Sequence, residues 1–169
     1  IGFSKVGLTS LVDGPGRRFL QTRGGTLRMG ASFKTFRLQD GCITGAELAD
    51  GTVLRADHYV SALPFDVLGQ TMPDGMMAKP YFFDAAKLES SPIVRIHLWY
   101  ERPVMDQRFV GFLDSPVQWV FNRSLIQGSE DQSGQYLCIS ISGAWDYIDR
   151  PKEEIRDVFG REMERLFPR

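Results

Sequence analysis

The sequence predicts an α+β fold in which antiparallel strands form most of the ordered chain. The first observation is the alternation of IVRIHLWY, residues 93–100, because successive side chains of a strand leave opposite faces. The second is a pair of Asp-Gly dipeptides, Asp40-Gly41 and Asp50-Gly51, which favour tight hairpin turns. The third is the helical spacing of apolar residues from Ile155 to Leu166. We therefore expect an antiparallel hairpin ladder, a second mixed and mostly antiparallel sheet, and a C-terminal helix packed on that sheet.

The composition is that of an ordinary globular protein. The chain has 169 residues, 43% hydrophobic and 24% charged, with a net charge of -1, which fits one domain or two small lobes. This charge gives no case for nucleic-acid binding, which a basic stripe would indicate. Cys42 and Cys138 lack metal-ligand spacing and are typical of small apolar residues in a reducing compartment. No apolar run approaches the roughly 18 residues of a membrane span, so we expect a cytoplasmic location.

The N-terminal part is predicted to contain one helix. An apolar stretch, Leu8–Val12, is interrupted by Gly14-Pro15-Gly16. Proline suits the first turn of a helix, so the pattern predicts a helix that begins near Pro15, continues through Arg17–Thr22 and ends at Gly24-Gly25. The Gly-Pro-Gly cluster has neither the preceding strand nor the third glycine of a dinucleotide-binding turn, and we do not interpret it as one.

A hairpin ladder should follow this helix. Apolar and β-branched runs bounded by Gly, Asp and Pro predict five strands, at Leu27–Met29, Ala31–Leu38, Cys42–Leu48, Val53–Arg55 and His58–Leu63. Pro64 ends the last of them, because proline cannot donate to a strand ladder. Short helices are predicted at Phe65–Leu68 and Tyr81–Leu88.

The central region, Ser91–Arg123, is predicted to be a meander of three strands: Ile93–Tyr100, Phe109–Leu113 and Val117–Phe121. A further alternating strand, Tyr136–Ser142, precedes the last helix, with Asp149 as its cap and Pro151 in its first turn. The aromatic residues of this region allow two interpretations. They pack in the core, or Arg95, His97, Trp99 and Trp119 face a cavity for a large apolar ligand.

Self-contained catalytic machinery is not evident in the sequence. No serine lies in a nucleophile elbow, and neither cysteine has an evident base. The histidines, His58 and His97, each lie in an apparent strand, and no pair of carboxylates can be singled out for acid–base chemistry. The catalytic residues are therefore unassigned, and we expect no metal ligands.

Residues 24–64 carry an ordered set of short motifs: Gly24-Gly25, Gly30-Ala31, Asp50-Gly51, Ala56-Asp57 and Ala62-Leu63-Pro64. This pattern resembles the middle of FAD-dependent amine oxidases and phytoene desaturase-like flavoproteins. The stretches SPIVRIHLWYERPVMD and FVGFLDSPVQWVFNRS are similar to the squalene-associated FAD-dependent desaturases, the hydroxysqualene dehydroxylases of hopanoid biosynthesis. With the final helix included, the resemblance spans nearly the whole chain.

The resemblance implies a larger parent enzyme. In that family an N-terminal Gly-rich turn holds the flavin pyrophosphate and a C-terminal segment closes over the flavin, and neither is found in this sequence, which does not begin with methionine. We therefore expect a fragment, with residues 1–68 as a hairpin lobe of the FAD-binding domain and 69–169 as part of the substrate-binding domain. By position Phe33, through its backbone, and Pro64 would flank the cofactor. The parent should bind FAD, whereas the fragment alone should bind none and be inactive.

The resemblance also implies a long apolar isoprenoid substrate, such as squalene, hydroxysqualene or a phytoene-like polyene. Such a ligand needs an elongated apolar site, and Arg95, His97, Trp99 and Trp119 are the candidate substrate-binding residues. For dehydroxylation, Arg95 and His97 would donate to the leaving hydroxyl. The alternative is that Arg95 is paired at the sheet surface.

Other functions stay open at this point. Within the flavoenzymes, the runner-up is a carotenoid-desaturase or amine-oxidase-like activity. A different class is a stand-alone α+β module that binds an apolar ligand or a protein partner without redox chemistry. An exposed substrate-side face would favour a homodimer of the fragment, and the parent would attach peripherally to the inner membrane face.

Overall fold

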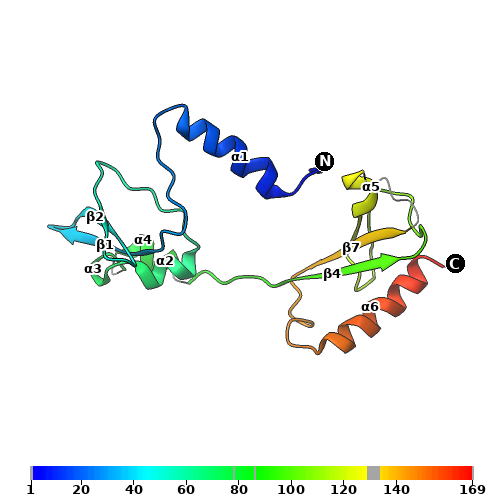
Figure 1. Ribbon diagram of the computed structural model, residues 1–169. Coiled ribbons are helices and arrows are strands. Elements are labelled where there is room, and N and C mark those ends of the chain that lie inside the picture. Colours follow the sequence, from blue (N-terminus) through cyan, green and yellow to red (C-terminus); the bar gives the residue numbers. More distant parts are fainter. Residues whose placement is uncertain (1, 78, 86, 129–133, 169) are drawn as a thin grey trace. The chain divides into compact units, whose positions relative to one another are not determined.

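The computed structural model describes residues 2–77, 79–85, 87–128 and 134–168 (Figure 1). The chain divides into two compact units: residues 24–90, here the hairpin unit, and residues 1–23 with 91–169, here the sheet unit. The predicted division at Leu68 falls inside a helix, Phe65–Thr71, whose end contacts the hairpin. The Thr35 hydroxyl donates to the Thr71 carbonyl at 2.8 Å. The roles assigned to the two predicted lobes stay predictions.

The hairpin unit is built on an antiparallel three-stranded sheet in the order β1-β2-β3. Its strands are β1 (Phe33–Gln39), β2 (Cys42–Leu48) and β3 (Val53–Leu54). Phe36 and Leu48 are its buried hydrophobic side chains among the described residues. Three short helices follow: α2 (Phe65–Thr71), α3 (Asp74–Met77) and α4 (Pro80–Ala85). The sequence predicted the first and last of these helices and missed α3.

The two Asp-Gly turns differ. Asp40 and Gly41 have φ angles of 50° and 77°, the left-handed pair that a two-residue type I′ turn requires, so this prediction is confirmed. At the second turn Gly51 N–H donates to the Leu48 carbonyl at 3.0 Å, and Leu48 N–H donates to Thr52 at 2.8 Å. That connection is a longer turn with Gly51 alone recorded at positive φ, 85°, so the predicted tight pair is wrong there.

The predicted strands at Leu27–Met29 and His58–Leu63 do not form. In the second segment, the Tyr59 side chain bonds to the backbone of residues that precede the segment. The Tyr59 hydroxyl accepts from the Ala56 N–H at 2.9 Å and donates to the Leu54 carbonyl at 3.4 Å. Apolar composition alone indicated a strand here, but strand formation needs a pairing partner.

The sheet unit begins with a helix that is longer than predicted. Helix α1 (Leu8–Gln21) is continuous and contains Pro15 in its interior, so the predicted start near Pro15 is wrong. Proline removes one helical hydrogen bond and crowds the preceding turn, but an ion pair spans the site. Arg17 donates to Asp13 at 2.9 Å across one helical turn.

A four-stranded antiparallel sheet follows, in the order β4-β7-β6-β5. Its strands are β4 (Ile93–Tyr100), β5 (Phe109–Gly111), β6 (Trp119–Asn122) and β7 (Gln135–Ser142). The predicted meander is therefore wrong, because β7 lies between β4 and β6. The reason lies in burial: Leu137, Ile139 and Ile141 of β7 are at most 2% exposed, so the most apolar strand takes an inner position.

Helix α6 (Lys152–Leu166) covers one face of this sheet (Figure 1). It begins after Pro151, which takes the cap position predicted for Asp149. Its Phe159 and Met163 pack with the inward side chains of β6 and β7, and burying each such apolar side chain contributes roughly 1.5–3 kcal/mol. The even-numbered residues of β4 pack against this cluster, as the alternation predicted: Val94, Ile96, Leu98 and Tyr100.

Buried amides fasten the segment after β4 to this sheet. The Gln135 side-chain carbonyl accepts from the Val104 and Met105 N–H groups at 2.9 and 3.0 Å. Asn122 donates to the Met105 carbonyl at 2.9 Å and accepts from the Leu125 N–H at 3.1 Å. Asn122 thus caps α5 (Arg123–Gln127), a helix that the sequence did not predict. The cap fixes the start of α5, where Arg123 is the first residue.

Candidate functional site

The sheet face opposite α6 carries the predicted substrate residues, and we call it the open face. Arg95, His97 and Trp99 are exposed, the last at 73%. Trp119 is 44% exposed on β6, whereas its neighbour Val120 has no exposed surface and lies in the core. Period-two alternation puts neighbouring residues on opposite faces. The side chains of Trp99 and Trp119 are therefore not part of the hydrophobic core.

Strand register arranges the open face in rows. Arg95 lies opposite Ser140, which lies opposite Trp119. One row along, His97 lies opposite Cys138, which lies opposite Phe121. In each row, one strand, β7, separates the polar side chain on β4 from the aromatic side chain on β6. The insertion of β7 makes this arrangement possible.

His97, Trp99 and Tyr136 form a stack at one end of the open face. The Trp99 and Tyr136 rings are parallel within 3°, with centroids 4.9 Å apart. The His97 Nδ1 shares a 2.7 Å hydrogen bond with the Tyr136 hydroxyl. Because this bond occupies Nδ1, Nε2 is the imidazole nitrogen left to face a ligand. The stack orients an imidazole beside a flat apolar wall.

A second aromatic group lies across β5 and β6. The Phe109 ring centroid is 6.2 Å from Trp119 and 6.4 Å from Phe121, and Phe3 packs 5.1 Å from Phe109. Gly111 makes room for this group, since a Cβ there would lie 3.0 Å from the Trp119 ring. The open face thus offers a broad aromatic surface on which a long apolar chain can lie.

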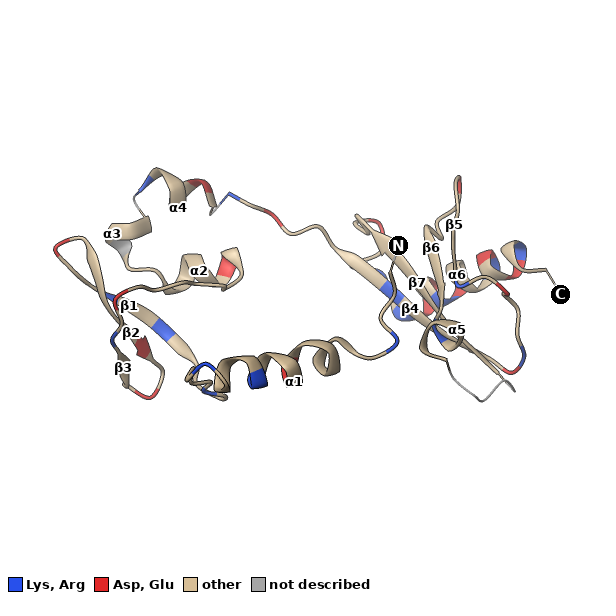
Figure 2. Cartoon of the chain, turned by 90° about the horizontal axis from the view of Figure 1, so that it is seen from above, with Lys and Arg blue, Asp and Glu red and all other residues tan. Residues whose placement is uncertain are grey.

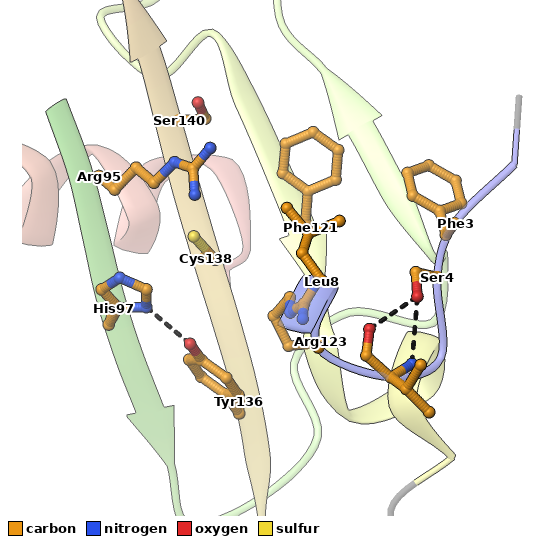
Figure 3. Close-up of a pocket in the computed structure, with 12 residues that line it drawn as sticks. Phe3, Ser4, Leu8, Arg95, His97, Phe121, Arg123, Tyr136, Cys138 and Ser140 are labelled. Carbon is orange, nitrogen blue, oxygen red and sulfur yellow. Dashed lines mark hydrogen bonds between the residues drawn. The ribbon is translucent and has the colours of Figure 1, made fainter. Parts of the chain in front are cut away.

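A cavity of about 410 Å³ adjoins this surface (Figure 3). Residues of the N-terminal segment form one side of it, including Phe3, Val6 and Leu8. The sheet forms the other side with Arg95, His97, Phe121, Arg123, Tyr136, Cys138 and Ser140. Trp99 and Trp119 do not line the cavity and lie beside it on the open face. Of the four predicted substrate residues, the structure therefore brings Arg95 and His97 into one cavity.

Electrostatics in the cavity are dominated by positive charge. Burial raises the pKa of the Cys138 thiol, while the charges of Arg95 and Arg123 act in the opposite direction. The positive charges of Arg95 and Arg123 are thus both felt at the Cys138 thiol in the cavity wall. The thiol stays protonated at neutral pH, which makes it a weak nucleophile.

The two predicted cofactor residues lie in the hairpin unit. Phe33, half-buried on β1, packs 4.7 Å from the Phe36 ring and lines a cavity of about 500 Å³ that is mostly apolar. Leu63 lines the same cavity, while Pro64 is exposed and caps α2. The structure places Phe33 beside the segment that ends at Pro64, and only Phe33 of the two lines the cavity.

Sequence reasoning did not single out Tyr136, Arg123 or Phe3 as site residues. Tyr136 was placed on one strand face with Cys138 and Ser140, but its partner strand was unknown. Arg123 follows a predicted strand with no signal of its own. Phe3 reaches the sheet through a tertiary contact that no local pattern indicates. Pairing of the strand Gln135–Ser142 with β4 would have placed Tyr136 opposite Trp99 and so identified it as a site residue.

Comparison with known proteins agrees with this architecture. Residues 2–169 match the family described as flavin containing amine oxidoreductase. The chain belongs to this family of flavoproteins.

Named relatives extend the comparison. The chain is 34% identical over 157 residues to a 15-cis-phytoene desaturase of Synechococcus elongatus, covering 88% of this chain and 33% of that protein. It is 27% identical to the chloroplastic/chromoplastic 15-cis-phytoene desaturase of Capsicum annuum, covering 88% of this chain and 26% of that protein. An oxidoreductase from Methanosarcina mazei has the same fold, with a TM-score of 0.70 at 15% identity, over 90% of this chain and 37% of that chain. The chain thus spans about a third or less of the curated relatives it matches.

A flavin fits part of this chain's chemistry. β1 is an edge strand of its sheet, so its outer backbone groups are open to a ligand such as adenine, and the apolar cavity beside Phe33 suits a flat ring. For the pyrophosphate the fit fails: Gly14 and Gly16 lie inside α1, where backbone N–H groups are engaged in the helix. The described residues contain no group of His, Cys, Asp or Glu arranged to hold a metal ion. Nor does any helix in the described ranges have the length and hydropathy needed to cross a membrane.

Proposed function

We propose that this chain is part of an FAD-dependent oxidoreductase that acts on an isoprenoid, with squalene or hydroxysqualene of hopanoid biosynthesis as the substrate class. Phytoene-like polyenes of carotenoid biosynthesis are the alternative. Family membership and the relatives named phytoene desaturase support the redox class. The observation that carries the proposal is the exposed aromatic open face, because two large indoles on a sheet are costly to leave in water without a ligand.

The open face would bind the hydrocarbon. Trp99 on its Tyr136 stack and Trp119 with Phe109 and Phe121 offer flat rings to an elongated chain. Such contacts are non-directional and exclude water, as an apolar ligand requires. Phe109 and Trp119 belong to neighbouring strands in fixed register, so the surface is formed before the ligand arrives.

The polar residues beside this surface would act on an oxygen of the substrate. A flavin, when bound, supplies hydride transfer to or from a substrate carbon. Loss of a hydroxyl also needs a proton or a strong donor at the leaving oxygen. The His97 imidazole, held through Nδ1 by Tyr136, offers Nε2 for that role, and Arg95 offers a permanent charge. Neither requires a rearrangement of the sheet.

The hairpin unit would flank the adenine end of the cofactor. Phe33 would do so through its backbone and Pro64 through its position at the start of α2. A backbone contact accepts any side chain, which explains how phenylalanine can stand there. The parent would attach peripherally to the inner membrane face, where its substrate dissolves.

The test uses the complete protein that contains this chain, purified with its flavin. With the flavin chemically reduced under anaerobic conditions, hydroxysqualene should restore the oxidised absorbance and yield squalene in chromatography with mass spectrometry. With the flavin oxidised, a phytoene-like substrate should bleach it if the desaturase alternative holds. A protein without flavin that still binds squalene would support the non-redox module instead.

A matched pair of tryptophans tests the open face. Trp99→Ala should lower kcat/KM by about tenfold or more by removing ligand contact. Trp145 is 61% exposed in the turn after β7, away from the cavity, and Trp145→Ala should leave kcat/KM within about twofold. Equal effects from the two variants would overturn the assignment of the open face.

A further inference from the structure

Two arginines line the sheet-unit cavity and form no ion pair with another described residue. Arg95 comes from the middle of β4 and Arg123 from the first turn of α5. Across the described residues, the ion pairs involve other arginines, such as Arg17, Arg37 and Arg165. Among the residues that the structure describes, no aspartate or glutamate lines the cavity. Two like charges therefore line one cavity in which no described residue supplies a counter-charge. Figure 2 shows how the basic and acidic residues are distributed along the ribbon.

The rest of the cavity wall reinforces this polarity. The charges of both guanidinium groups act on the Cys138 thiol. Figure 3 shows the Arg95, Arg123 and Cys138 side chains lining the same cavity. Gly7 and Leu8, at the start of α1, also line the space, and α1 has no side-chain cap and no acidic residue in its first turn. The N-terminus of a helix carries partial positive charge. That charge adds to the effect of the arginines.

The same cavity has an apolar side. Phe3, Val6, Leu8 and Phe121 line it, and Phe121 continues into the aromatic group with Trp119 and Phe109. A ligand complementary to this space has an anionic end and an apolar chain. A free anion would leave the aromatic wall uncovered, and a pure hydrocarbon would leave both guanidinium groups unpaired.

A neutral hydroxyl group would engage only part of this arrangement and leave donors of the second guanidinium without an acceptor. One hydroxyl accepts at most two hydrogen bonds, whereas each guanidinium offers five N–H donors. Planar forks of this kind match carboxylate and phosphate oxygens. We propose that this cavity binds the oxyanion head of an amphipathic isoprenoid, a phosphate ester or a carboxylate, between Arg95 and Arg123. The isoprenoid identity of the chain rests on the proposed function, and the anionic head rests on the cavity alone.

Binding to the 169-residue chain tests this directly. Geranyl phosphate, geranic acid, geraniol and inorganic phosphate are titrated separately by calorimetry, with tryptophan fluorescence as a second readout. Geranyl phosphate or geranic acid should bind at least tenfold more tightly than geraniol, since hydrogen bonds to a charged head group are stronger than those to a neutral hydroxyl. Either should also bind at least tenfold more tightly than inorganic phosphate. The order of the two acids distinguishes a phosphate head from a carboxylate head.

Variants locate the head group. Arg95→Gln and Arg123→Gln should each weaken binding of the preferred acid by about tenfold and leave geraniol binding unchanged, with a partial rescue by Arg123→Lys. Arg161→Gln is the matched control, because Arg161 is exposed on α6, which covers the opposite face of the sheet. Near-ultraviolet circular dichroism checks that each variant is folded. If neither glutamine variant folds, the comparison of acid with alcohol in the unaltered chain decides.

The inference is overturned if geraniol binds as tightly as both acids, or if inorganic phosphate binds as tightly as geranyl phosphate. It is also overturned if folded Arg95→Gln and Arg123→Gln keep the full preference for the acid. These outcomes are separate from the fate of the proposed function. A complete protein that converts no isoprenoid, although this chain prefers geranyl phosphate, would contradict the function and keep the anion site.

Discussion

The indole of Trp99 lies parallel to the phenol ring of Tyr136, at 4.9 Å between centroids and 3° between planes. These residues are directly opposite each other on β4 and β7, so their stacking is a cross-strand pair. Trp99 is nevertheless 73% exposed. One ring face is covered by tyrosine and much of the rest is available to a ligand.

A pair of β4 substitutions should separate the core from the open face. Ile96→Ala should lower the free energy of unfolding by about 2 kcal/mol or more, because Ile96 packs against the cluster under α6. Trp99→Ala should cost less than about 1 kcal/mol, since it removes mainly one exposed stacking contact. Denaturant midpoints measured by far-ultraviolet circular dichroism give both values. A larger loss for Trp99→Ala would contradict the assignment of the two faces.

The buried side-chain amide of Gln135 should contribute more to the free energy of unfolding than the less buried amide of Gln118. Gln135→Ala leaves the Val104 and Met105 N–H groups without their acceptor, which should cost about 1–3 kcal/mol. Hydrogen exchange of those two amides should accelerate. Gln118 makes a comparable pair of bonds to Ser142 near the surface, and Gln118→Ala should cost less than about 1 kcal/mol because water replaces the lost partner. Similar losses from both variants would disprove the role of burial.

Glu162 should contribute to stability in a pH-dependent way. Hydrogen bonds from Arg165 and Ser115 lower the pKa of Glu162 to about 2, from 4.5. A carboxyl group with a lowered folded-state pKa stabilises the fold above its unfolded pKa, and this contribution is lost as pH falls through the folded pKa. Between about pH 4.5 and 2, the unfolding midpoint of Glu162→Gln should therefore change less than that of the unaltered chain. Glu164→Gln, an exposed change on the same helix, should reproduce the unaltered profile.

The 169-residue chain should purify without flavin. Its glycines at 14 and 16 lie in a helix rather than in a phosphate-binding turn, so the strongest part of a dinucleotide site is missing from it. Absorbance between about 350 and 500 nm, typical of flavins, should be absent after gel filtration with added FAD. A stoichiometric flavin band that survives this step would refute the expectation.

Local patterns predicted much of this fold. Alternation predicted the bounds of the strand Ile93–Tyr100, and the helical spacing of apolar residues predicted that α6 packs on this sheet. The order of strands was beyond such patterns, because the pairing of Gln135–Ser142 with β4 joins segments far apart in the sequence. Apolar composition misled at His58–Leu63, where no neighbouring strand is available.

The candidate site divides in the same way. Arg95, His97 and Trp99 share a strand face, and one-dimensional alternation was enough to find them. Tyr136 and Arg123 join them through strand pairing and a buried cap. Such residues are invisible to periodicity, because tertiary contacts decide their position.

The central place of β7 ties the cavity to the hydrophobic core. Its odd-numbered residues Leu137, Ile139 and Ile141 are buried, while Tyr136, Cys138 and Ser140 face the cavity. A slip of one residue in pairing would exchange these two sets, sending three aliphatic side chains to water. The chain therefore cannot shift this strand and keep a stable but altered pocket. Mutations that shift the register of β7 would therefore be selected against because they destabilise the fold, and the same selection preserves the cavity residues on its other face.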